Sequence, residues 1–417
     1  MTNQLLHSNK LSSGSERWTS LLMLAVLFLL VHSAKAQEGS QGNTSIFGGA
    51  QMTFFGNHNF VTGGGGAQPG VILTERATDN FGVLNFVGDN LTSTGASDAG
   101  YVDGYVRKYG AGQFIFPVGD NGFLGQFAAS ADGTMGAYFR ANPATAVTSN
   151  LFTGTNYPAL PNGGPFPTGL LNRGAGVKSV STVEYWDIDG TVATPITLTW
   201  DASSNVTTLT GSVLAALTIV GWDGSKWVRI PSTVNATSIL GGTSTVTEGS
   251  ITTVLPVVPN TYTAYTLAGV GPDVTPRISV VPGIVNGVQR LEIVLAVLEV
   301  GTVAATTGQI TVRLAKNALL SNFEWDPAQA IAPANGNVTV QNSIWTASAS
   351  DPNYYIFTTT TSIPRSSQRR LAFYVTLNPN GTDGTFALPT TIPAGQGGGE
   401  VNVLNNQDSE VIQFFAN

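Results

Sequence analysis

The feature that most constrains this fold is an alternation of apolar and polar residues with a period of two. It recurs in nearly every segment after residue 37, and Gly, Asn, Asp or Pro stands at the segment ends. Side chains of a strand point alternately to its two faces, so this period predicts strands separated by turns. No segment carries a sustained helical periodicity. The 49 glycines and the 10% of charged residues agree with this reading, because ordinary domains have about 25% charged residues. We therefore predict an all-β protein.

The first 36 residues have the order of parts found in secretory signal peptides. Basic residues lead into an apolar run at residues 21–31, and small residues stand at Ala34 and Ala36, the two positions that specify cleavage. The alternative is a membrane anchor, but this run is shorter than the about 20 residues that cross a bilayer. We predict cleavage after Ala36, export, and no transmembrane span in the mature chain.

The rest of the chain divides into three β regions and one linker. Residues 37–105 are rich in glycine and predict a region of short strands, and residues 106–268 predict a β-sandwich. Residues 269–276 contain two prolines and no apolar periodicity, which is typical of an interdomain linker. Residues 277–417 have the clearest alternation. They predict an immunoglobulin-like β-sandwich, because stacking two one-sided sheets removes both apolar faces from water.

The sequence lacks the residues that several classes of function require. The chain has no cysteine, which excludes thiol catalysis and thiolate metal sites. His58 is the one histidine after residue 36, and its polar neighbours predict a turn residue rather than a catalytic base. The net charge is −7 and no basic stripe exists, so nucleic acid is not an expected partner.

The sequence GWDGSKWVRI at residues 221–230 predicts a β-hairpin. With Gly224 and Ser225 in a two-residue type II′ turn, the register places Trp222 opposite Trp227. Arg229 then lies on the same face, where it can cover an indole ring. Such cross-strand pairs stabilise a hairpin, and we interpret the motif as a structural corner.

The alternative interpretation of these tryptophans is a carbohydrate-binding site. Trp222 and Trp227, joined by Trp186, would stack their flat rings on the apolar faces of sugars. Exposure of the rings decides between the two interpretations.

The acidic residues of EYWDIDG at residues 184–190 are the other candidates for chemistry. Asp187 and Asp189 form an Asp-x-Asp-Gly fragment that is similar to part of a calcium loop, but the further ligands of such a loop do not follow. We expect the two carboxylates to accept hydrogen bonds from turn amides, with calcium as the alternative and no other cofactor. Glu184 with Asp187 or Asp201 is a candidate carboxylate pair for a glycoside hydrolase.

Five motifs occur in an order that resembles the large secreted and cell-surface β-rich proteins of Bacteroidetes-type bacteria: GYVRKYG at 104–110, FIFPVGD at 114–120, EYWDIDG at 184–190, LTWD at 198–201 and GWDGSKWVRI at 221–230. GGGEVNVLNNQD at 397–408 resembles the end of bacterial immunoglobulin-like repeat domains. The resemblance implies export by the general secretory route and, in that phylum, often crossing of the outer membrane by the type IX system. It brings no catalytic residues.

These observations predict a non-enzymatic exported protein, structural or adhesive, at the cell surface or in the extracellular space. The expected partners are cell-surface or extracellular-matrix components, with glycans among them. The terminal strand and the glycine-rich start are also candidates for self-assembly by strand addition. The alternatives are a carbohydrate-binding protein and a carboxylate-dependent glycoside hydrolase.

Overall fold

The structure is a computed structural model, and it confirms the all-β prediction. It describes residues 38–40, 42–60, 70–76, 80–145, 147–149, 156–158, 161, 163–301, 306–400 and 402–416. The expected signal peptide lies outside the described residues. No helix in the described part of the chain is long and apolar enough to span a membrane.

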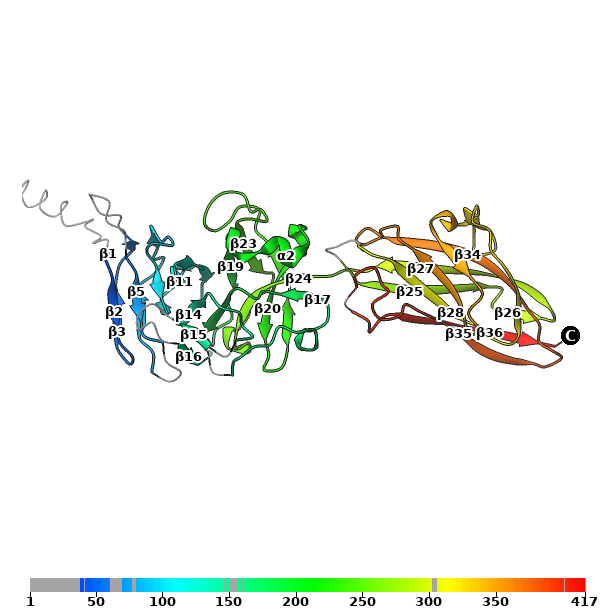
Figure 1. Cartoon of the computed structure of the whole chain (residues 1–417), viewed down its shortest axis with the longest axis horizontal. Helices are drawn as coiled ribbons and strands as arrows, with labels where there is room; N and C mark the ends of the chain where they lie inside the picture. The colour runs from blue at the N-terminus through cyan, green and yellow to red at the C-terminus, as the bar shows by residue number, and fades with distance from the viewer. Residues whose placement is uncertain are drawn as a thin grey trace, which may run out of the picture.

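The described part of the chain begins, at residue 38, as a short parallel β-solenoid of three rungs (Figure 1). Each strand pairs in parallel with its counterpart in the next rung, in the orders β1-β4-β7, β2-β5-β8 and β3-β6-β9. The rungs comprise β1 (Glu38–Ser40), β2 (Thr44–Ile46) and β3 (Gln51–Phe54), then β4 (His58–Phe60), β5 (Ile72–Thr74) and β6 (Val83–Val87), then β7 (Ser93–Thr94), β8 (Val102–Asp103) and β9 (Tyr105–Tyr109). The sequence predicted short strands here, but it did not predict this parallel stacking.

Aromatic rings stack along the inside of the solenoid. His58 is fully buried, and its ring lies parallel to that of Phe54 with 4.5 Å between the centroids. Burial lowers the pKa of His58 to about 4, so the imidazole is neutral at physiological pH. Its Nε2 lies 3.0 Å from the hydroxyl of Ser40. The expectation that His58 is a turn residue was wrong, because the ring packs inside a strand rung.

The solenoid runs without a break into a β-sandwich. β8 pairs in parallel with β11, and β9 pairs with β14, so the solenoid strands β3, β6 and β9 extend a nine-stranded sheet in the order β21-β20-β24-β18-β14-β9-β6-β3, with β17 beside β24. A five-stranded sheet, β10-β13-β19-β23-β22, packs against it. One hydrophobic core extends from Ile46 to Leu267. The expected boundary between residues 105 and 106 therefore does not divide the core, and we call residues 38–270 the N-terminal body.

The remaining elements of the N-terminal body are mostly short. They are β10 (Phe114–Phe116), β11 (Val118–Asp120), β12 (Phe123–Leu124), β13 (Phe127–Ala129), β14 (Thr134–Phe139), β15 (Val147–Ser149), β16 (Asn156–Pro158), η1 (Leu170–Asn172), β17 (Val177–Val180), β18 (Tyr185–Asp189), β19 (Thr197–Trp200), η2 (Ala202–Ser204), α2 (Val206–Thr210), η3 (Leu214–Ala216), β20 (Leu217–Trp222), β21 (Trp227–Ile230), β22 (Ser232–Val234), β23 (Gly249–Thr253), η4 (Pro259–Thr261) and β24 (Tyr265–Val270).

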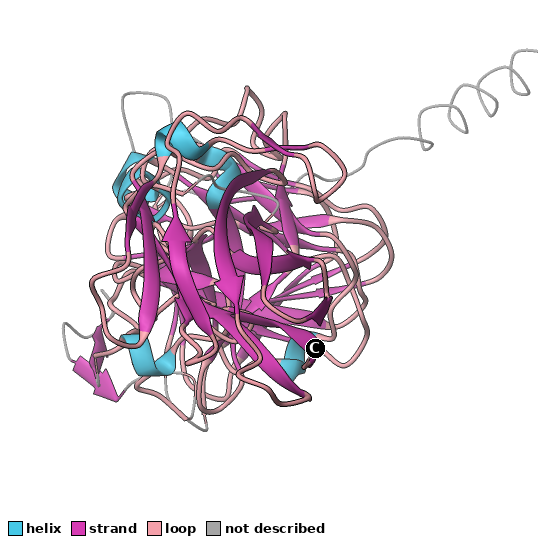
Figure 2. Ribbon diagram, turned by 90° about the vertical axis from the view of Figure 1, so that its right-hand side faces the viewer, coloured by secondary structure: helices cyan, strands magenta, loops and turns pink. Residues whose placement is uncertain are grey.

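The C-terminal body, residues 274–416, is a two-layer β-sandwich. A four-stranded sheet, β25-β27-β34-β29, and a six-stranded sheet, β26-β36-β35-β28-β33-β32, enclose a second core. Figure 2 looks along the molecule from this side and shows how few helices accompany the strands. The elements are β25 (Val274–Val281), β26 (Ile284–Asn286), β27 (Gln289–Glu299), β28 (Ile310–Ala315), β29 (Leu320–Glu324), β30 (Ile331–Ala332), β31 (Val338–Thr339), η5 (Asn342–Ile344), β32 (Thr346–Ser348), β33 (Tyr354–Thr359), β34 (Gln368–Leu377), β35 (Gly384–Thr391) and β36 (Gln407–Phe415).

Two expectations about this region need correction. The expected linker at residues 269–276 overlaps both flanking strands, because β24 ends at Val270 and β25 begins at Val274. The terminal strand β36 is also not available for strand addition. It pairs with β35 along residues 407–414 on one side, and β26 pairs with residues 413–415 on the other side, so the end of the strand is paired on both edges.

Candidate functional site

The tryptophan hairpin is a structural corner, as the preferred interpretation predicted. Trp222 lies opposite Trp227 with ring centroids 5.5 Å apart, and Gly224 has a φ of +99°, as the first position of a type II′ turn requires. Trp222 is 5% exposed and Trp227 is fully buried. Phe166 packs on both rings, and the Trp227 Nε1 donates to the carbonyl of Pro167 at 3.1 Å. Arg229, expected to cover an indole, is exposed.

Burial rules out the sugar-stacking role proposed for these rings. Trp186 is also fully buried, and its Nε1 donates to the carbonyl of Gly125 at 2.7 Å. A sugar stacks only on a ring face that solvent can reach, and Trp222, Trp227 and Trp186 offer none. The alternative carbohydrate site at these three positions was therefore wrong.

Two carboxyl groups of EYWDIDG, those of Glu184 and Asp187, are buried inside the N-terminal body. The Tyr105 hydroxyl donates to Asp187 Oδ2 at 2.7 Å, and burial together with the charge of Asp189 raises the pKa of Asp187 well above its usual range. The turn amide of Gly190 donates to Asn260 instead of to either aspartate. In the part of the chain that the structure describes, no three His, Asp or Glu side chains are placed to hold a metal ion. Calcium at Asp187 and Asp189 stays a prediction.

Of the candidate hydrolase carboxyls, Glu184 and Asp187 are buried and Asp201 is partly exposed. Glu184 is 2% exposed, accepts a hydrogen bond from the Tyr138 hydroxyl at 2.8 Å, and has its pKa raised to about 7 by burial. Asp201 caps the short helix η2 by accepting the amide of Ser203 at 2.7 Å. A sugar bond cannot reach a carboxyl group in the position of Glu184.

A second buried group of charges joins the solenoid to the sandwich. The Arg76 guanidinium is fully buried, lies 2.7 Å from Asp103 and 3.5 Å from Asp120, and stacks over the ring of Phe139. Burial raises the pKa of Asp120 to about 6, while the charge of Arg76 lowers it. These charges hold three chain segments together inside the protein, where no ligand reaches them.

Accessible polar and aromatic side chains meet on the C-terminal body instead. The face of β25-β27-β34-β29 that points away from the core, which we call the outer face, is crossed by residues 326–345, the strap. The strap is held by apolar contacts and by Asn342, whose Nδ2 donates to the Ala372 carbonyl at 2.7 Å and whose Oδ1 accepts the Ala372 amide at 2.9 Å. Its apolar contacts involve Val294, Ala332, Val338, Val340 and Ala372. Because the strap crosses at Val294 and Ala372, it leaves a hollow on either side.

The first hollow, which we call the Trp325 hollow, has a volume of about 440 Å³. Arg290 lies 2.6 Å from Glu324 and 3.5 Å above the ring of Tyr374. Trp325 and Gln329 are partly exposed, and the side chain oxygen of Gln329 has no hydrogen-bond partner among the described residues. The residues that line this hollow are Arg290, Glu324, Trp325, Asp326, Gln329, Ile331, Pro333 and Tyr374.

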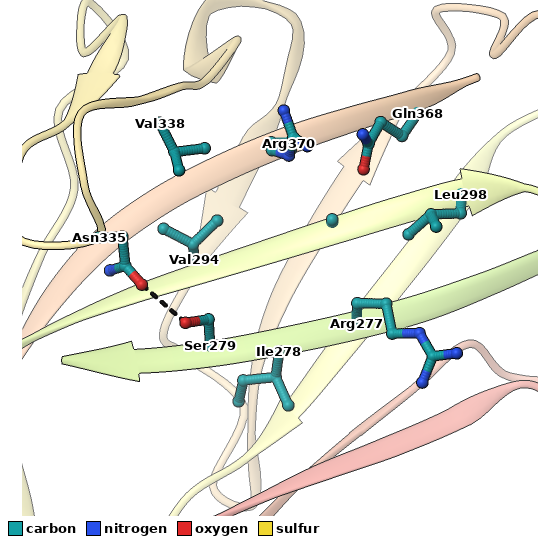
Figure 3. A pocket seen from close by; sticks show the side chains of 10 residues that line it. Arg277, Ile278, Ser279, Val294, Leu298, Asn335, Val338, Gln368 and Arg370 are labelled. Carbon is teal, nitrogen blue, oxygen red and sulfur yellow. Dashed lines mark hydrogen bonds between the residues drawn. The ribbon is translucent and has the colours of Figure 1, made fainter. Parts of the chain in front are cut away.

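The second hollow, which we call the arginine hollow, has a volume of about 260 Å³ (Figure 3). Val294 and Leu298 lie on its floor, and Arg277 and Arg370 stand at its sides. The Ser279 hydroxyl donates to Asn335 Oδ1 at 2.7 Å, which ties the strap to β25. An apolar floor between two guanidinium groups suits an apolar partner that carries an acid.

Neither hollow was predicted from the sequence. The alternation of polar and core residues on two strands could have indicated them: Arg290 and Glu292 alternate with core residues on β27, and Tyr374 alternates with core residues on β34. Of the tryptophans in the described residues, Trp325 alone is not buried; the others are Trp186, Trp200, Trp222, Trp227 and Trp345.

Comparisons with known proteins find solved structures at low identity and low TM-score. No family model and no curated protein matches the chain. Among solved structures, the N-terminal domain of the Streptococcus gordonii adhesin Sgo0707 shares 11% identity, with a TM-score of 0.26 and coverage of 73% of this chain and 78% of that one. A CARDB domain from Pyrococcus furiosus, solved with di-metal ions, shares 17% identity with a TM-score of 0.23 over 35% of this chain and 96% of that one.

A cohesin module from a Clostridium perfringens family 33 glycoside hydrolase shares 11% identity, with a TM-score of 0.25 and coverage of 35% of this chain and all of that one (100%). Identities and TM-scores this low do not show what this chain binds.

Proposed function

We propose that this is a non-enzymatic exported protein, structural or adhesive, whose contact surface is the outer face of the C-terminal body. The observation that carries the proposal is the contrast between the two bodies. The candidate site residues of the N-terminal body, Trp222, Trp227 and Glu184, are buried, while the exposed or partly exposed side chains of Arg290, Tyr374 and Arg370 lie on the outer face. Such side chains carry most of the binding energy where proteins meet their partners.

The outer face has the rigidity that a contact surface needs. Arg290, Glu292 and Tyr374 project from paired strands of one sheet, and the Tyr374 hydroxyl donates to Glu292 at 2.7 Å. The Asn335 amide donates to the same carboxylate at 2.9 Å, which anchors the strap. Side chains fixed in this way lose little entropy on binding. The candidate partners are cell-surface or extracellular-matrix components.

Export is part of this proposal. The expected signal peptide at residues 1–36 and the resemblance to secreted Bacteroidetes-type proteins support it. Fractionation of the source cells should place the chain outside the cytoplasm with Gln37 as its first residue. An intact chain recovered from the cytoplasm would contradict export.

Carbohydrate binding is the second candidate, and Trp325 favours it. The Trp325 ring packs against the core, 5.6 Å from Phe357 between centroids, and is partly exposed. The neighbouring Glu324, Asp326 and Gln329 offer acceptors and an amide for sugar hydroxyls. This candidate moves the carbohydrate alternative from the buried Trp222 and Trp227 to a different body of the protein.

The test is a binding screen of the mature chain, residues 37–417, on glycans and immobilised extracellular proteins. Trp325→Ala should abolish glycan binding, and Arg370→Ala should weaken binding of an acidic protein partner at least tenfold. Leu404→Ala, at an 84% exposed position outside both hollows, is the matched control and should change neither. Binding that no outer-face variant alters would overturn the proposed surface, and turnover of a polysaccharide by the same sample would overturn the non-enzymatic assignment.

A further inference from the structure

Among the residues that the structure describes, the first rung of the solenoid is an open sheet edge at one end of the molecule. β1, β2 and β3 are each the outermost strand of a sheet and pair with the second rung on one side. Figure 1 places this rung at the end opposite the C-terminal body. An open edge presents backbone N–H and C=O groups that can pair with another strand.

The hydrogen bonds of β2 show which of its backbone N–H and C=O groups point toward the second rung. The Thr44 amide donates to the Val71 carbonyl at 3.1 Å, and the Ile46 carbonyl accepts the Glu75 amide at 2.8 Å, so both residues use their backbone groups toward the second rung. Successive residues of a strand present these groups to opposite sides. The N–H and C=O of Ser45 therefore face the open edge.

The first rung carries few of the devices that keep sheet edges apart. Its charged residue is Glu38 at the start of β1, and residues 39–57 contain no Lys, Arg, Asp, Glu or Pro, whereas edge strands of monomeric proteins are commonly protected by a charge or a proline. Phe47, Met52 and Phe55 are 60%, 38% and 72% exposed on the same rung. Cleavage after Ala36 would leave a single residue ahead of β1. An edge of this kind is suited to pairing.

We propose that two copies of this protein dimerise head to head through their first rungs, with β1, β2 and β3 of each copy extending the sheets of the other. A second copy is the fitting occupant because its edge has the same number of strands and the same spacing, and because residues 39–57 of both copies carry no charged side chain. Turning one solenoid to face the other reverses its strands, so the pairing across the contact is antiparallel.

The geometry also limits the assembly to two copies. The other end of the solenoid is occupied, because β8 pairs with β11 and β9 pairs with β14 of the same chain. A first rung can therefore meet only another first rung. Such a contact is two-fold and closed, and it produces a dimer rather than a filament.

A pair of proline variants tests the contact. Ser45→Pro removes an N–H that faces the open edge, so it should leave thermal stability of the monomer unchanged and raise the dimer dissociation constant at least tenfold. Thr44→Pro is the matched control. It removes the N–H bonded to Val71, so it should lower thermal stability instead. Light scattering coupled to size-exclusion chromatography, over a range of concentrations of the mature chain, measures the mass.

Cysteine cross-linking gives a second readout that does not depend on a proline. The chain has no cysteine, so Gly39→Cys, Ser45→Cys and Thr53→Cys each place one thiol on a different strand of the first rung. In a two-fold contact one of the three sheets pairs with itself, and the thiol on that sheet should cross-link to its own copy in high yield. Thr233→Cys on β22 is the exposed control and should not cross-link.

Three results would overturn the proposal. They are a mature chain that remains monomeric at high micromolar concentration, particles that keep growing with concentration, and a dimer that survives Ser45→Pro without cross-linking at any first-rung cysteine. A dimer lost in Ser45→Pro and cross-linked through one first-rung strand is the expected outcome.

Discussion

Replacing Arg76 with methionine should destabilise the N-terminal body, and more strongly at pH 8 than at pH 5. The guanidinium is fully buried, 2.7 Å from Asp103 and 3.5 Å from Asp120, and it donates to the Tyr138 carbonyl at 3.0 Å. Methionine keeps much of the side chain volume. It removes the positive charge from between two buried carboxylates.

The magnitude follows from the distances. At an effective dielectric constant of about 20, charges separated by these distances attract by about 6 and about 5 kcal/mol. Removing the guanidinium also removes its own desolvation cost, which offsets much of that loss. Deleting one partner of a buried ion pair costs about 3–5 kcal/mol in practice, and we expect a value in that range at pH 8.

The pH dependence gives the sharper test. Burial already raises the pKa of Asp120 to about 6, and losing Arg76 removes the charge that lowers it. A carboxyl whose folded pKa lies above its unfolded value favours folding below that unfolded pKa and loses this contribution as pH rises through the folded pKa. The variant should therefore recover part of its stability at pH 5, where these carboxyls take up protons.

Urea unfolding followed by tryptophan fluorescence measures both effects. Arg290→Met is the control, because Arg290 lies 2.6 Å from Glu324 but both side chains are about half exposed. Exposed pairs contribute about 0–1 kcal/mol, so this variant should cost little at either pH. The reasoning fails if Arg76→Met costs no more than Arg290→Met at pH 8, or if its cost is the same at pH 5.

Three further changes probe the packing and the charges. Gly221→Ala places a Cβ 2.3 Å from Cγ of the Tyr262 ring and should cost about 1–3 kcal/mol in urea unfolding. Trp227→Ala empties a fully buried site and should cost about 3–5 kcal/mol, while any glycan binding by the folded protein should persist. Burial raises the pKa of Glu299 to about 7, and the charge of Asp273 adds to this shift. The C-terminal body should therefore lose stability as the pH rises from about 4.5 to 7. Thermal unfolding of Glu299→Gln should lack this part of the pH dependence, and an unchanged profile would contradict it.

Sequence reasoning succeeded where local pattern decides the structure. The period of two predicted strands throughout, and the spacing around Gly224 predicted the pairing of Trp222 with Trp227. Both follow from interactions between residues close in sequence. The immunoglobulin-like sandwich at residues 277–417 was equally accessible, because each of its long strands alternates clearly, as in β34.

The solenoid was not predictable by the same reasoning. Its strands are short, and a strand of three residues such as β2 carries the same pattern in a parallel or an antiparallel sheet. The partner of β2 is β5, about 28 residues further on in register, and turns of irregular length separate the two. Glycine-rich turns predicted where the chain bends, but not which strands meet after the bends.

The candidate site was missed because burial depends on distant segments. Phe166 packs against Trp222 and Trp227, and Pro167 accepts a hydrogen bond from Trp227. Both residues lie far from the hairpin in the sequence, so the hairpin sequence alone does not predict that its tryptophans are buried. Trp325 packs against the core of the C-terminal body, with Phe357 5.6 Å away between ring centroids, and is partly exposed. Residue type pointed to tryptophan, and tertiary packing decided which tryptophan remained accessible.

The two proposals together have a consequence that neither has alone. A head-to-head dimer would carry two outer faces, and Figure 1 places the outer face and the first rung in opposite halves of the molecule, so both faces would remain free. Two linked sites bind a dense surface about 10² to 10⁴ times more tightly than one, without any new contact. The monomeric Ser45→Pro variant should therefore bind a densely coated surface at least about 10²-fold more weakly, yet bind the same ligand in solution with unchanged affinity. Equal losses in both formats would mean that the variant had damaged the outer face itself, and no loss in either would mean that the two faces act independently.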